Sequence, residues 1–203
     1  MLTPVMRPHL LSTVAFALSL AVTAFAHPLP DVPVQATFDD TGAGTVHVEF
    51  DLRFLDADPT TAPYFKNEFL ADKPAAWRTE AMEKALAFVT THIEFFLEPA
   101  GRATPDWQWE FSGQKSAALA TPEDPVMLTG TWRVAPGAKG YRIRSTPANT
   151  WSVLFLNTLR GKELERTQVL FPGESSFTLE IAPAAPPAAK AGPLPWWRRW
   201  FGA

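Results

Sequence analysis

The repeated alternation of apolar and polar residues in short runs constrains the fold of this chain more than any other feature of its sequence. It is clearest at 45–53. The apolar positions of this run are Val46, Val48, Phe50 and Leu52. Because the side chains of a β-strand alternate between its two faces, the run predicts a strand with one buried face. Turn residues at 39–44 join it to a preceding strand at about 34–38, which predicts a hairpin.

The same alternation returns after residue 92 in several further runs, which are separated by turn sequences that contain Gly. We expect strands at about 93–97, 107–111, 128–134, 141–143, 151–155, 164–171 and 177–181. Many short strands at this spacing predict a mainly β protein, and more specifically an antiparallel β-sandwich of immunoglobulin-like type. The large apolar residues expected inside the sandwich are Phe50, Phe95, Trp109 and Phe155.

Between the second and third predicted strands the period of the pattern changes from two to that of a helix. The residues that recur at helical spacing are Trp77, Ala81, Ala85 and Phe88. This stripe predicts a helical insert at about 61–90. Because the apolar stripe is wide, we expect the insert to pack onto the sheet instead of standing free.

The first 26 residues have the composition of a secretory signal peptide. Arg7 and His9 precede an apolar run at 10–22, and the sequence Ala-Phe-Ala at 24–26 fits the small-residue pattern that signal peptidase cleaves. The run is shorter than a membrane-spanning helix requires. We therefore expect export and cleavage after residue 26, which would make His27 the mature N-terminus. An uncleaved N-terminal anchor is the alternative.

The sequence changes character after the last predicted strand. We expect a folded domain at 27–182, then a Pro/Ala-rich linker at 183–195 and a tail at 196–203. The tail residues expected to contact a membrane or a partner are Trp196, Trp197, Arg198, Arg199, Trp200 and Phe201. Because Trp favours the membrane interface and Arg favours anionic headgroups, the tail predicts peripheral binding to an anionic membrane surface or a membrane protein. The alternative is a tail without a binding role.

Composition and motifs argue against several classes of function. The chain has no Cys, which excludes thiol chemistry and Cys-type metal sites. With 18 basic and 21 acidic residues it has a formal net charge of −3, whereas nucleic-acid binding usually needs a basic face. The sequence contains no G-x-S-x-G or H-E-x-x-H motif and no phosphate-binding Gly loop. We therefore expect no catalytic residues, no enzyme activity and no nucleic-acid partner.

Three histidines are candidate metal ligands. After cleavage His27 would carry both an α-amine and an imidazole, and these two nitrogens together suit copper or nickel. His47 is expected on the polar face of the strand at 45–53, and His92 on the polar face of the strand near 93–97. A three-histidine site forms if these faces meet near the N-terminus. The alternative is that His47 and His92 are solvated surface residues and that the protein holds no cofactor.

The sequence Ala-His-Pro-Leu-Pro-Asp at 26–31 resembles the opening of the extracytoplasmic domain of HupE/UreJ-type membrane proteins, and the stretch from 153 to 177 resembles the end of that domain. The resemblance covers about 27–182. It implies a β-rich domain from a family associated with nickel or cobalt handling. Members of the family continue into several transmembrane helices, where this sequence has its linker and tail. The resemblance therefore implies a stand-alone domain beside a polytopic membrane partner, without transport activity of its own.

These features predict an exported, non-enzymatic accessory or binding module in the periplasm, peripheral to the outer face of the cytoplasmic membrane. One alternative is a soluble periplasmic protein that binds metal through His27. The other alternative is a structural or adhesive β-sandwich module with no small ligand.

Overall fold

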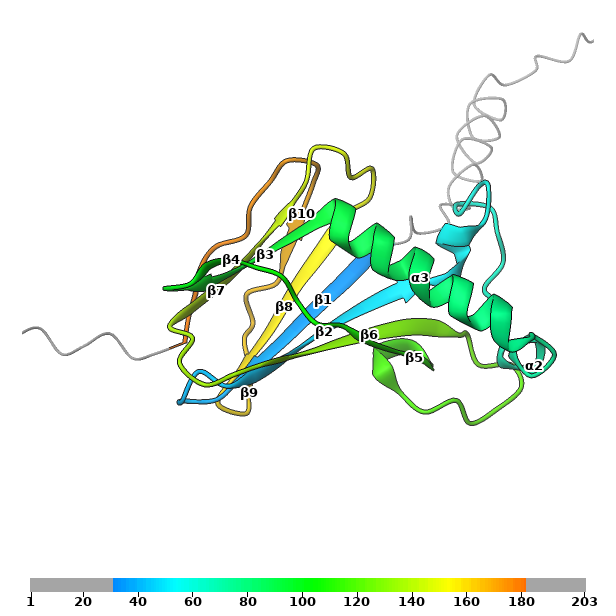
Figure 1. The fold of residues 1–203 in the computed structure, drawn as a ribbon, viewed down its shortest axis with the longest axis horizontal. Helices are drawn as coiled ribbons and strands as arrows, with labels where there is room; N and C mark the ends of the chain where they lie inside the picture. Colours follow the sequence, from blue (N-terminus) through cyan, green and yellow to red (C-terminus); the bar gives the residue numbers. More distant parts are fainter. Residues whose placement is uncertain (1–30, 182–203) are drawn as a thin grey trace, which may run out of the picture.

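Two β-sheets form the framework of residues 31–181, the part of the chain that the structure, a computed structural model, describes (Figure 1). The strands of the seven-stranded sheet are β1 (Val32–Phe38), β2 (Gly44–Asp51), β5 (Gln108–Ser112), β6 (Met127–Val134), β8 (Val153–Leu159), β9 (Lys162–Glu163) and β10 (Gln168–Leu170). They lie in the order β10-β8-β1-β2-β6-β5, and β9 pairs with β8. The strands of the four-stranded sheet are β3 (Ile93–Glu98), β4 (Gly101–Ala103), β7 (Gly140–Ser145) and β11 (Leu179–Glu180). Their order is β11-β7-β3-β4, so the prediction of a mainly β protein is confirmed.

The helical segments lie in two of the connections between strands, from β2 to β3 and from β5 to β6. They are η1 (Leu52–Leu55), α2 (Asn67–Leu70), α3 (Ala75–His92) and η2 (Gln114–Ser116). The helical insert predicted at about 61–90 therefore corresponds to α2 and α3, and the residues before α2 are not helical. The prediction that placed His92 on a strand is wrong, because α3 continues to His92 and the β-branched Ile93 begins β3 directly after it.

The strand pairs follow the predicted antiparallel arrangement with one exception. β1 and β2 form the predicted hairpin, with Val34 opposite Val48. β1 and β8 are parallel, with Val34 opposite Phe155, so the prediction of an exclusively antiparallel sandwich is wrong at this pair. A tight turn forces two strands to run antiparallel, whereas β1 and β8 are separated by most of the described chain and their relative direction is free of that constraint.

The seven-stranded sheet has one buried face, which we call the inner face. Alternate residues of β2 such as Val46, Val48 and Phe50 lie on it. One part of the inner face packs against the four-stranded sheet, and the core cluster there includes Phe95 and Ile143. Another part packs against α3, which Figure 1 shows in front of the sheet. The predicted packing of the helical insert onto the sheet is therefore confirmed.

Three of the four predicted core residues are buried. Phe50, Phe95 and Phe155 belong to the core clusters. Trp109 is only partly buried, so its placement inside the core is wrong. Its ring lies over Gly130 on the neighbouring strand, where a Cβ atom would approach the ring to 2.8 Å. Because β5 is an edge strand, Trp109 has a sheet neighbour on one side only and covers the border of the core.

The terminal segments of the chain lie outside the described residues. The predicted signal peptide at 1–26, His27, the linker at 183–195 and the tail at 196–203 therefore keep the status of predictions. Within residues 31–181, no helix is both long and apolar enough to cross a membrane.

Candidate functional site

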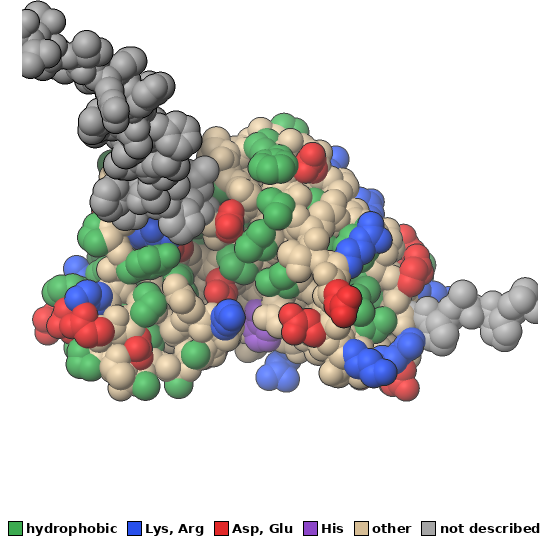
Figure 2. Space-filling view, turned by 180° about the vertical axis from the view of Figure 1, so that it is seen from behind, with side chains coloured by type: hydrophobic (Ala, Val, Ile, Leu, Met, Phe, Trp, Pro, Cys, Tyr) green, Lys and Arg blue, Asp and Glu red, His purple; other side chains and the backbone are tan. Residues whose placement is uncertain are grey.

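A groove of about 330 Å³ lies on the outer face of the seven-stranded sheet, opposite the inner face. We call it the outer-face groove. Its floor is apolar and comes from Pro33 of β1, Leu154 and Leu156 of β8, and Met127 of β6. The register of the parallel β1–β8 pair explains why these apolar side chains share one face of the sheet, because it places Pro33 opposite Leu154. Figure 2 views the molecule from behind Figure 1, on the side of this outer face, and shows apolar side chains among acidic and basic ones.

A buried ion pair lies at one end of the outer-face groove. Asp51 is the last residue of β2, and Arg53 follows in η1. The Nε and Nη2 atoms of Arg53 donate to Oδ2 of Asp51 at 2.8 and 2.6 Å. The side chains of Arg53 and Asp51 are only 7% and 8% exposed. The backbone N–H of Arg53 donates to Oδ1 of Asp51, so the same carboxylate also caps η1.

The guanidinium of Arg53 is held on its other side by an aromatic ring. Its central carbon lies 3.9 Å from the centroid of the Tyr64 ring, a cation–π contact. Burial alone would lower the pKa of Arg53, but the hydrogen bonds and charge of Asp51 outweigh it and raise the pKa. Arg53 is therefore charged at neutral pH, and its charge is balanced by Asp51.

Glu49 supplies a second carboxylate to the outer-face groove. It lies on β2 two residues before Asp51 and is half-buried. Burial raises the pKa of Glu49, although backbone hydrogen bonds from Ser116 and Lys115 and the charge of Lys115 act in the opposite direction. Among the described residues, Glu49 has no partner within ion-pair distance. No ion pair among the described residues therefore balances its charge.

The turn η2 forms one wall of the outer-face groove above Glu49. Lys115 and Ser116 both have left-handed backbone conformations, with φ angles of 57° and 55°. Consecutive non-Gly residues in this region carry strain that the surrounding structure must hold in place. The carboxylate of Glu49 favours this turn, because the backbone N–H groups of these two residues lower its pKa and so stabilise its charged form.

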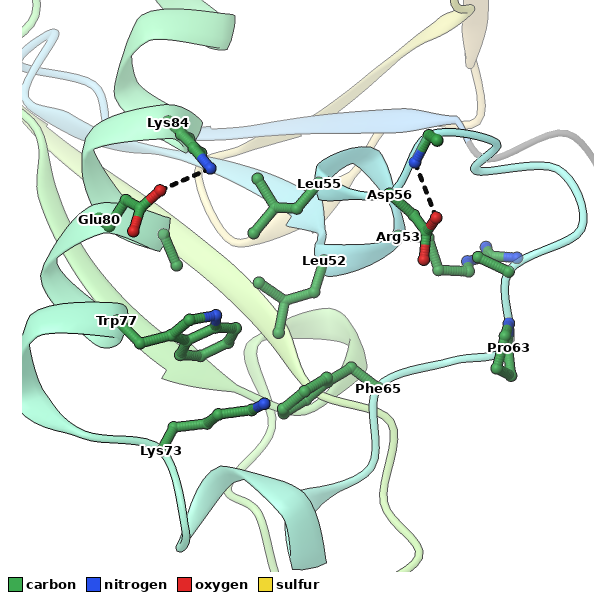
Figure 3. Close-up of a pocket in the computed structure, with 13 residues that line it drawn as sticks. Leu52, Arg53, Leu55, Asp56, Pro63, Phe65, Lys73, Trp77, Glu80 and Lys84 are labelled. Atoms are coloured by element: carbon green, nitrogen blue, oxygen red, sulfur yellow. Dashed lines mark hydrogen bonds and ion pairs between the residues drawn. The ribbon is translucent and has the colours of Figure 1, made fainter.

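A second groove, of about 400 Å³, lies on the other side of η1, between η1 and α3 (Figure 3). The rings of Phe65 and Trp77 stack there with centroids 5.3 Å apart, and Nζ of Lys73 lies over both rings. Glu80 and Lys84 of α3 pair at 2.7 Å across the rim. The basic groups of this groove are therefore paired or stacked, and Asp56 is its one carboxylate without a cationic partner among the described residues.

The two described histidines among the predicted metal ligands, His47 and His92, do not come together. His47 lies on the outer face of β2, with Nδ1 3.1 Å from Oγ1 of Thr131. The ring of His92 lies 4.5 Å from the ring of Phe88, which packs on Phe50 at the inner face. Within residues 31–181, no group of three or more His, Cys, Asp or Glu side chains could hold a metal ion. Copper or nickel binding through His27 remains a prediction.

The two described histidines make the stability of the protein depend on pH. Burial lowers the pKa of His47 and His92 from 6.5, and Glu110 partly opposes this at His47. The folded state therefore binds fewer protons than the unfolded state, and stability falls as pH decreases through the unfolded pKa near 6.5. We expect urea unfolding to show this loss between pH ~7.5 and ~5.5. The loss should be smaller in a His47→Asn/His92→Asn variant, and an equal loss in both proteins would contradict the assignment.

Comparison with known proteins adds no relative: no family model, no curated protein and no solved structure matches the chain. The resemblance to HupE/UreJ-type domains and the function that it implies therefore stay predictions.

Proposed function

We propose that the protein is an exported, non-enzymatic binding module that acts in the periplasm, beside a membrane partner at the outer face of the cytoplasmic membrane. In this proposal the outer-face groove holds the ligand. The observation that carries it is the combination of an apolar floor, a fixed Asp51–Arg53 pair and the half-buried carboxylate of Glu49, which forms no ion pair among the described residues. Concave sites with mostly apolar walls and a few oriented polar groups are the usual form of small-ligand sites.

The chemistry of the outer-face groove supports binding over catalysis. Its lining residues include no Ser, Thr, Cys or His, and its one hydroxyl belongs to Tyr64. Covalent catalysis needs a nucleophile next to a base that activates it. Asp51 is occupied by Arg53 and by the backbone of η1, so it is poorly placed to act as that base.

Export and membrane association are proposed from the sequence. The signal peptide at 1–26, the tail at 196–203 and the HupE/UreJ-like motif at 26–31 support them. The same motif supports a place in nickel or cobalt handling. An immunoglobulin-like relation between the two sheets belongs to this proposal as well.

Deleting residues 183–203 tests the membrane part of the proposal. We expect the melting temperature to stay nearly unchanged, because these residues follow the last described strand. We expect the truncated protein to be released from membranes or from anionic vesicles, since each Arg contributes about 1 kcal/mol near an anionic surface and the aromatic residues add an interfacial contribution. Sedimentation with vesicles and cell fractionation measure this.

A matched control separates charge from aromatic contact in the tail. An Arg198→Gln/Arg199→Gln variant keeps every aromatic residue of the tail. It should bind anionic vesicles more weakly and lose the sensitivity to salt that the unchanged protein shows. The proposal fails if the full-length exported protein is found entirely in the soluble fraction and ignores anionic vesicles. N-terminal sequencing that reads His-Pro-Leu-Pro would establish export and cleavage.

A further inference from the structure

We propose that the outer-face groove selects a monovalent organic amine with an apolar body, and that Glu49 is the counter-ion of its ammonium group. This inference rests on the proposed function, because it takes the groove as the binding element of the module. It names the chemical class of ligand that the groove accepts.

The charges that line the groove favour a cation over an anion. The guanidinium of Arg53 is poorly placed to bind an anionic ligand, because two of its nitrogens bind Asp51 and its face is covered by Tyr64. The charged groups left over are Asp31, Glu49 and the exposed Lys115, which together carry a net charge of about −1 at neutral pH. A ligand with one positive charge therefore balances the net charge of the groove, whereas a carboxylate ligand would add to its negative charge.

The surroundings of the Glu49 carboxylate favour the binding of an ammonium group in particular. The carboxylate is partly removed from water, and this burial raises its pKa because it disfavours the charged form. The backbone N–H groups of Lys115 and Ser116 lower its pKa, and an ionised carboxylate has about four acceptor positions, so acceptor capacity remains. An ammonium group can donate to these positions and form charge-assisted hydrogen bonds, which are stronger than neutral ones.

The rest of the groove fits an organic amine better than a metal ion. A hard metal cation needs several oxygen ligands, usually with carboxylates among them, and the described residues contain no group of three or more His, Cys, Asp or Glu side chains that could hold a metal ion. The floor beside Glu49 consists instead of Pro33, Met127, Leu154 and Leu156. These side chains can cover the apolar body of a ligand whose charged end meets Glu49.

Three probes with the same apolar body test the inference on the full mature chain. They are hexylamine, 1-hexanol and hexanoate, and their binding is measured by titration calorimetry and by NMR chemical-shift changes at neutral pH. We expect hexylamine to bind at least about tenfold more tightly than 1-hexanol, because one charge-assisted hydrogen bond is sufficient for that ratio. We expect hexanoate to bind most weakly.

Two matched variants locate the preference. In Glu49→Gln the advantage of hexylamine over 1-hexanol should disappear, while the affinity for 1-hexanol stays the same. Glu110 is the control, because it lies on the same outer face opposite Thr129, which is itself opposite Glu49, and it does not line the groove. Glu110→Gln should keep the full preference. The wild-type comparison of the three probes stands without any variant, so the inference remains testable if Glu49→Gln does not fold.

The outcomes distinguish this inference from the proposed function. Equal binding of hexylamine and 1-hexanol, with shifts at groove residues, would overturn the selection of a cation and leave the groove as a binding element. A preference for hexanoate, or a preference for hexylamine that survives in Glu49→Gln, would overturn the role of Glu49. Absence of hexylamine binding would overturn the inference, while membrane fractionation would still decide the accessory role separately.

Discussion

Replacing Phe155 by Ala is expected to lower the free energy of unfolding by about 3–5 kcal/mol. Phe155 lies on β8 and is fully buried. Its ring is 5.6 Å from the ring of Tyr141 on the smaller sheet and 5.2 Å from the ring of Phe177. The substitution therefore leaves a cavity between the two sheets, in addition to removing apolar surface from the core. Urea unfolding followed by Trp fluorescence and circular dichroism measures the loss.

Phe171 offers a matched control for this substitution. It is a residue of the same type just beyond β10, the strand that pairs with β8, but 57% of it is exposed. Phe171→Ala should change the free energy of unfolding by no more than about 0.5 kcal/mol. Similar losses in the two variants would mean that Phe155 does not lie between the sheets.

The alternation of residues was sufficient to predict the inner face of the larger sheet. In β2 it assigned Val46, Val48 and Phe50 to the core, and these residues are buried. It also assigned His47 to the opposite face, where the structure has it. The pattern works here because a one-residue shift of register would move every apolar side chain of the strand to the wrong face.

Pairing between distant strands was not predictable in the same way. β8 pairs with β1 only after three strands of the smaller sheet have followed β1 in the chain. No local sequence pattern predicts which strand β8 pairs with, or in which direction. The helix end was missed for a local reason. The polar and apolar residues near His92 fit both the last turn of a helix and the start of a strand, and the i,i+4 contact between Phe88 and His92 within α3 favours the helix.

The outer-face groove shows a further limit of local reasoning. Glu49 was recognisable as a residue on the polar face of a strand, and such residues are ordinarily solvated. Its partial burial comes with the η2 turn, which packs against β2 although it lies far from Glu49 in the sequence. Left-handed backbone conformations are usually predicted from Gly, but here Lys115 and Ser116 adopt them, so their residue types do not predict the turn. The groove therefore became visible only in the folded chain.

Breaking the Asp51–Arg53 pair is the second substitution with a large expected effect. Arg53→Met should lower the free energy of unfolding by about 3–5 kcal/mol, because it leaves the charge of Asp51 buried without a partner. The cost arises from this uncompensated charge and not from the loss of a favourable contact alone. The Coulomb attraction of a buried pair is largely offset by the free energy required to remove both charges from water.

A double variant separates these two contributions. Asp51→Asn/Arg53→Met removes both charges and keeps an acceptor oxygen that can cap η1. We expect it to be more stable than Arg53→Met alone, since replacing a whole buried ion pair by neutral groups is often close to neutral in free energy. Urea unfolding of the wild type and of the single and double variants gives the coupling free energy between the two residues. If the double variant is as unstable as Arg53→Met, burial of an unpaired Asp51 is not the cause. The loss would then reflect the packing of Arg53 on Tyr64.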